Sequence, residues 1–168
     1  EAKKRGLTTT NSVRLGSMVS AVNAGPEVSP VLTEVKSVAA GYPLRGSIRV
    51  STPDGGEKPV AGQPAPGDVW IDERLAQRLG VKAGGQAQVG AAALNVALVF
   101  KEEPEVAGSF LTMSPKLLLN DADLARTQLV QPGTRASWRV HVAGKGSEAY
   151  ETWAKSALGA GQRLDTVR

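Results

Sequence analysis

The chain has 168 residues, 41% of them hydrophobic, which is enough for one good core or for two small subdomains that share an interface. Its 20 basic and 16 acidic residues are interspersed and give a net charge of +4, without the basic stripe and stacking aromatic residues of a nucleic-acid-binding domain. The absence of cysteine excludes disulfides and thiol chemistry, and the single histidine, His141, leaves too few ligands for zinc.

The two ends of the sequence indicate a fragment of a longer polypeptide. Residues 1–7 read as the end of a helix that stops at Gly6, and the chain finishes at Arg168 without a terminal cap. The longest apolar run, residues 91–100, is about half of what a membrane-spanning helix needs. We therefore expect any signal or transmembrane segment to lie outside this sequence.

The first third of the chain predicts three strands. Apolar residues alternate with polar or small ones over 12–21 and over 31–38, and the proline-bearing loop between these runs favours a hairpin. Gly41-Tyr42-Pro43 then breaks the pattern, and residues 46–52 are expected to form a third short strand. Residues 53–67 are rich in proline and glycine, which predicts a flexible crossing segment and a subdomain boundary.

The middle of the chain predicts a small βαβ-like unit. A strand over 68–71 leads into a helix over 73–79, which Asp72 caps and Gly80 ends. Gly84-Gly85 marks a turn, and strands are expected over 86–89 and 94–100.

Shorter elements are expected after this unit. Phe110–Met113 predicts a strand, and Ser114-Pro115 is a helix-start signal. A second short helix is expected to begin at Asn120 or Asp121, and Gln131-Pro132-Gly133 predicts a turn and a second boundary.

The last part of the chain predicts a strand, a helix and a final strand. Residues 137–142 alternate so that Trp138, Val140 and Val142 point inward, which places His141 toward solvent or a subdomain seam. Ser147 is expected to cap a helix with one apolar stripe that ends at Gly159, and residues 162–167 to form a last strand.

Three sequence features invite a catalytic or nucleotide-binding interpretation. Gly144–Ala149 fits the pattern G-x-G-x-x-A between a strand and a helix, with Asp165 at the distance of a ribose-binding acid. The pairs Asp72-Glu73 and Glu102-Glu103 could supply acid/base carboxylates. Asp72 is better explained as a helix cap and Glu102-Glu103 as a solvated strand end. No nucleophile is paired with a base, so we predict a non-catalytic protein without cofactor or metal.

Several segments in a fixed order carry a resemblance to a known family. They are residues 40–46 (AGYPLRG), 64–85 (PAPGDVWIDERLAQRLGVKAGG), 102–104, 114–124 and 131–144. Together they resemble the first extracytoplasmic domain of YbbP-type ABC transporter permeases, relatives of MacB, LolC/LolE and FtsX. Gly85, Glu105 and Lys116 depart mildly from the family pattern, and a strand that the family has before the opening helix is missing, which could leave an unpaired sheet edge.

The resemblance implies an α+β fold in two parts. Residues 1–60 and 134–168 would form a discontinuous, porter-like α/β subdomain, and residues 64–133 an inserted, smaller, β-rich, Sabre-like subdomain. The domain would project into the periplasm from an inner-membrane permease. It would relay the movement driven by a separate cytoplasmic ATPase and contact a hydrophobic or lipid-related substrate or a periplasmic partner. A second permease copy, as in a homodimer, and a periplasmic esterase are further implied partners.

The residues most exposed to such contacts are expected in turn-rich loops with apolar or aromatic side chains. We name Tyr42, Leu44, Arg45 and Phe110 as contact residues, with loops 53–67 and 103–110 as further surfaces. Two alternatives stay open: a soluble small-ligand-binding module with a β-barrel-like core around residues 66–100, and an enzyme fragment that uses the Gly144–Ala149 loop.

Overall fold

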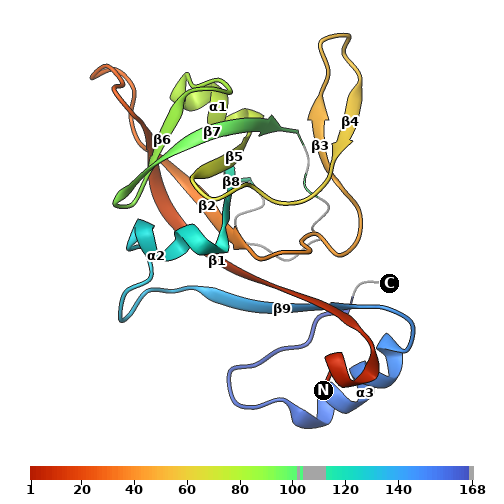
Figure 1. Ribbon diagram of the computed structural model, residues 1–168. Helices are drawn as coiled ribbons and strands as arrows, with labels where there is room; N and C mark the ends of the chain where they lie inside the picture. Colours follow the sequence, from red (N-terminus) through yellow and green to blue (C-terminus); the bar gives the residue numbers. More distant parts are fainter. Residues whose placement is uncertain (102, 104–112, 167–168) are drawn as a thin grey trace.

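The computed structural model describes residues 1–101, 103 and 113–166, and in this part of the chain the fold is mostly β (Figure 1). The strands are β1 (Thr8–Ala21), β2 (Val31–Val38), β3 (Ile48–Ser51), β4 (Glu57–Val60), β5 (Asp68–Asp72), β6 (Gln86–Val89), β7 (Ala92–Phe100), β8 (Lys116–Asn120) and β9 (Ser137–Ala143). The helices are η1 (Lys3–Arg5), α1 (Glu73–Leu79), η2 (Asp121–Asp123), α2 (Leu124–Thr127) and α3 (Ser147–Ala157).

Six strands close into a barrel in the order β2-β8-β5-β7-β6-β1, because β1 also pairs with β2. The β1–β2 hairpin is antiparallel, from Ser12 opposite Val38 to Val19 opposite Val31. The pairs β2–β8 and β5–β7 are parallel, whereas β5–β8, β6–β7 and β1–β6 are antiparallel. Closure leaves no open edge in this part of the sheet, and the interior is filled by fully buried aliphatic side chains. These include Val19, Val35, Val69, Ile71, Leu94 and Leu117.

Helix α1 lies where local sequence signals predict it. The Asp72 side chain accepts a hydrogen bond from the backbone N–H of Leu75 at 2.8 Å, and Gly80 ends the helix in the left-handed region at φ 64°. Leu75 and Leu79 project into the barrel core. The strand, helix and second strand predicted over residues 68–89 are therefore confirmed, but the parallel partner of β5 is β7, and β6 pairs with β7 and β1.

A two-stranded hairpin, β3–β4, projects from the barrel (Figure 1). Its apolar residues Ile48 and Val50 pack with Trp70 and Phe100 in a second buried cluster. The predicted flexible segment 53–67 is thus partly ordered, because β4 forms within it and pairs with β3.

An extension lies beneath the barrel, and we call it the arm: residues 1–11 and 137–158 (Figure 1). Strand β1 is long enough to serve both parts. Thr8–Arg14 pairs with β9 in the arm, and Ser12–Val19 pairs with β2 in the barrel. The barrel therefore draws strands from both of the subdomains expected from the sequence, and the boundaries of that division stay a prediction.

Three secondary-structure predictions are wrong within the described residues. Residues 116–120 after Ser114-Pro115 form β8 and not a helix, because Leu117, Leu118 and Leu119 fill the gap between β2 and β5. Helix α3 begins at Ser147 with Gly146 as its N-cap, and no side chain caps it. Residues 162–166 form no strand; the predicted strand Phe110–Met113 lies outside the described residues except for Met113, which is in a turn.

The predicted faces of β9 are reversed. Trp138 and Val140 are 67% and 68% exposed, whereas His141 on the opposite face is partly buried against the barrel. The alternation over residues 137–142 is real. The inward face is nevertheless the polar one, because it meets the buried hydroxyl-bearing residues Thr10 and Ser12 of β1.

Candidate functional site

Three of the four predicted contact residues lie in the described part of the chain, and they differ in exposure. Tyr42 is only 4% exposed, so its side chain belongs to the interior. Leu44 is partly buried and Arg45 is exposed on the same loop, while Phe110 lies outside the described residues. The loop therefore divides into an internal aromatic anchor and an outer tip.

A buried charge cluster surrounds the Tyr42 hydroxyl group. Lys36 Nζ on β2 lies 2.8 Å from Glu103 Oε1 and 3.0 Å from the Tyr42 oxygen, and the Tyr42 hydroxyl donates a hydrogen bond to Glu103. Lys116 Nζ on β8 lies 3.8 Å from the other Glu103 oxygen. We call Lys36, Tyr42 and Glu103 the buried charge cluster; all three are less than 10% exposed.

Burial and charge pairing oppose each other in this cluster. Burial lowers the pKa of Lys36 to about 8, against the attraction of Glu103. Burial alone would raise the pKa of Glu103, but the ion pair and hydrogen bond with Lys36 bring it below its usual range. Burial and the neighbouring Glu103 charge raise the pKa of Tyr42, so its hydroxyl stays protonated and donates. The ion pair is therefore formed at neutral pH.

His141 connects this cluster to the arm. Its Nε2 lies 2.7 Å from Ser12 Oγ, and its ring meets the Tyr42 ring edge-on with centroids 5.6 Å apart. Burial, together with the nearby cations Lys36, Arg139 and Arg14, lowers the pKa of His141 to about 4. His141 is therefore neutral at physiological pH.

The features that invited a catalytic interpretation have structural explanations. Gly144 packs against Leu7, whose side chain would lie 3.0 Å from an added Cβ, and Asp165 pairs with Arg163 at 2.8 Å on the surface. Asp72 caps α1 as predicted. Glu103, however, is buried in an ion pair, so its interpretation as a solvated strand end is wrong; Glu102 lies outside the described residues.

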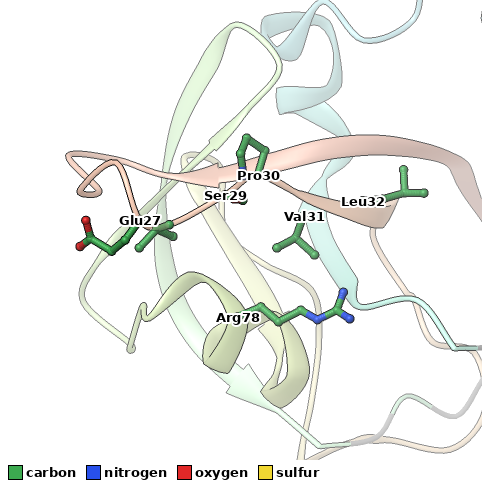
Figure 2. A pocket seen from close by; sticks show the side chains of 7 residues that line it. Glu27, Ser29, Pro30, Val31, Leu32 and Arg78 are labelled. Carbon is green, nitrogen blue, oxygen red and sulfur yellow. The ribbon is translucent and has the colours of Figure 1, made fainter.

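Two shallow hollows lie on the described surface. One, of about 440 Å³, is lined by residues 27–32 at the start of β2 and by Arg78 of α1. Figure 2 shows the Arg78 guanidinium extending past Val31, with the Glu27 carboxylate turned away from it. The other, also about 440 Å³, lies beside Leu124, Val130 and Trp138. Neither hollow pairs a nucleophile with a base, and among the described residues no group of three or more His, Asp or Glu side chains could hold a metal.

Sequence reasoning missed the roles of Lys36, Glu103 and His141. The alternation over 31–38 assigns Lys36 to a solvent face, but in β2 both faces are buried from Thr33 onward. The sequence signal that could have indicated the role of Lys36 is a charged residue in a short strand that begins and ends with valine. Its partner Glu103 is 67 residues away, so the sequence offers no local way to pair them.

The chain is similar in sequence to a known transport protein. No model of a known protein family matches it. Over 165 residues the chain is 34% identical to the uncharacterized ABC transporter permease YbbP of Escherichia coli (strain K12). This similarity covers 97% of the chain but only 19% of the permease, so the chain spans about a fifth of that relative's length. In the described part of the chain, each helix is too short or too polar to cross a membrane.

Proposed function

The chain is homologous, over nearly its whole length, to one segment of a YbbP-type ABC transporter permease, and from this premise we propose that it is the periplasmic domain of such a permease. The similarity is carried by the chain as a whole and not by a short motif. Its extent is the single observation on which the proposal rests.

In this proposal the domain acts mechanically, as in the MacB- and FtsX-like relatives. It relays outward the movement that a separate ATPase subunit drives from the cytoplasmic side. The N-terminal residues and α3 lie on the arm (Figure 1), and in this proposal the arm is the part nearer the inner membrane and the barrel the part farther out. The buried charge cluster supports a non-enzymatic role, because its reactive groups are enclosed and paired with one another.

The partners belong to the proposal as well. We propose an ABC ATPase, a second permease copy and a periplasmic esterase, with a hydrophobic or lipid-related compound as substrate. The loop tip at Leu44 and Arg45 is the contact surface that the described residues support, since Tyr42 anchors it from inside. The division into a porter-like part (1–60 and 134–168) and an inserted Sabre-like part (64–133) is retained as part of this proposal.

The alternative of a small-ligand-binding module has the β-barrel that it requires. The barrel interior, however, is occupied by side chains such as Val35, Ile71 and Leu117, which are fully buried. A ligand could not enter without displacing this core, so the barrel supports a packed scaffold better than a binding cavity.

The experiment is cysteine labelling of the longer protein in intact cells. The chain has no cysteine, and Gln77 on α1 is exposed, so Gln77→Cys supplies a unique site once cysteines elsewhere are replaced. A membrane-impermeant maleimide is expected to label it without permeabilisation, and the flanking gene sequence is expected to encode membrane-spanning helices. Labelling that requires permeabilised cells would contradict the periplasmic assignment.

A further inference from the structure

The arm and the barrel share one strand. Within the described residues, β9 pairs with β1 and with no other barrel strand, and β1 continues from the arm into the barrel wall. A single strand twists and bends easily along its length, so strand pairing by itself does not define the angle between the two parts. Further contacts must hold that angle if the two parts are to keep one arrangement.

The segment that follows β2 supplies such contacts to the arm. The Ala39 backbone N–H donates to the Asn11 carbonyl oxygen at 3.0 Å, and Thr10 Oγ1 donates to the Ala40 carbonyl oxygen at 2.8 Å. Two residues further on, the Tyr42 ring meets His141 of β9. We call Thr10, Ala39–Tyr42 and His141 the brace.

The same segment is fixed firmly to the barrel. The Tyr42 ring packs in a buried cluster with Val38, Trp70 and Leu118. Its hydroxyl group is held by the ion pair of Lys36 and Glu103, and Lys36 also lies 5.1 Å from the ring centroid. A displacement of His141 would therefore have to push against a residue that the barrel holds on several sides.

We propose that the brace locks the angle between arm and barrel, so that the domain moves as one rigid body, with His141 as the positioning residue. The inference rests on the proposed function in one respect: if movement enters the domain at the arm, a rigid connection transmits that movement to the barrel. A loose connection would dissipate that movement at the β1 strand.

The charges around His141 fit this role. Lys36 of β2, Arg14 of β1 and Arg139 of β9 are cationic, and Glu103 is the carboxylate among the groups that act on it. A protonated ring would be repelled by three cations and attracted by one anion. The neutral ring packs on Tyr42 without that repulsion, so the uncharged form of His141 is the one that fits the brace.

The test is the distance between spin labels on the arm and on the barrel in the isolated chain. Ser156→Cys on α3 and Gln77→Cys on α1 are both exposed positions, and the chain has no other cysteine. The distance distribution is expected to be narrow, and His141→Ala is expected to broaden it or to add a second maximum. Val140→Ala, on the exposed face of the same strand, is the matched control and is expected to leave the distribution unchanged.

A second label pair inside the barrel, Gln77→Cys with Ala93→Cys, reports whether the barrel stays folded. If His141→Ala also broadens this pair, Thr10→Val carries the test, because it removes the bond to Ala40 with little change in volume. An unchanged arm-to-barrel distribution in these variants, or equal broadening by Val140→Ala, would overturn the brace. That outcome leaves the permease proposal intact, since labelling in the membrane tests it separately.

Discussion

The buried charge cluster gives the sharpest prediction about stability. In Lys36→Met the Glu103 carboxylate loses its closest cation, at 2.8 Å, while both side chains are almost wholly buried (3% and 2% exposed). Removal of one partner of a buried ion pair costs about 3–5 kcal/mol, because the other charge stays buried without compensation. Glu103 keeps the Tyr42 hydroxyl group and the more distant Lys116, so we expect the lower end, about 3 kcal/mol.

A double variant measures how much of this cost comes from the interaction between Lys36 and Glu103 themselves. Glu103→Gln alone leaves Lys36 buried without its carboxylate and is expected to cost about 3 kcal/mol as well. Lys36→Met combined with Glu103→Gln removes both charges, so its cost is expected to fall below the sum of the two by about 2 kcal/mol or more.

The assay is urea unfolding followed by tryptophan fluorescence and far-UV circular dichroism. Lys82→Met is the matched control, because Lys82 is exposed, and it is expected to change the free energy of unfolding by less than about 0.5 kcal/mol. Two results would refute the reasoning: a cost below about 1 kcal/mol for Lys36→Met, or strictly additive costs in the double variant.

Three further predictions follow from single contacts. The pKa of His141 is lowered to about 4, so as the pH falls from about 6.5 to about 4 the unfolded chain takes up a proton that the folded chain does not. The free energy of unfolding is therefore expected to decrease over this range by up to roughly 3 kcal/mol, and by about 1–2 kcal/mol after allowance for the partial exposure of the ring. Urea titrations at several pH values are expected to show this loss in the wild type and not in His141→Gln. Asp72→Ala removes the acceptor for the Leu75 N–H and is expected to cost about 1–2 kcal/mol in thermal unfolding, whereas Asp72→Asn, which can still cap, should recover much of it. Gly90→Ala would place a Cβ 2.1 Å from the Thr127 carbonyl oxygen at φ 55° and is expected to cost about 2 kcal/mol of stability or more. Gly133→Ala, which also has a positive φ but meets no atom within 4 Å, is the control and is expected to cost about 1 kcal/mol. Equal costs for the two variants would contradict the close approach at Gly90.

The elements that were predicted well are those defined by neighbouring residues. Asp72 and Gly80 mark the two ends of α1, and the alternation over 31–38 corresponds to β2. These signals act within one or two turns of chain, so they need no knowledge of the rest of the fold. The β1–β2 hairpin was predictable for the same reason, because its strands are adjacent and joined by a turn-rich loop.

The elements that were missed depend on distant partners. The Pro115 signal favours a helix start, but pairing of β8 with β2 and β5 outweighs that local preference. On β9, a period of two shows that the faces differ without showing which one is inside, and the buried hydroxyl groups of β1 decide that question in favour of His141.

The candidate site was the least predictable part. Tyr42 has an aromatic ring in a turn-rich loop, a pattern that is equally typical of an exposed contact and of an internal anchor. Its ring packs on Trp70 and Leu118 and its hydroxyl group is bonded to Glu103, so its burial involves residues from distant parts of the chain. The resemblance to the permease family was recognisable because ordered segments spread over the chain carry it, independently of the three-dimensional arrangement.

The central claim, that this domain relays ATP-driven movement, is tested most directly in the assembled transporter. A fluorescent dye at Gln77→Cys, on the barrel, would be combined with acceptor lipids in a reconstituted bilayer that holds the full permease and its ATPase. Energy transfer to the lipids is expected to differ between the nucleotide-free and ATP-bound states, and an ATPase variant unable to bind ATP is expected to abolish the difference. Energy transfer that stays the same in both states would contradict it.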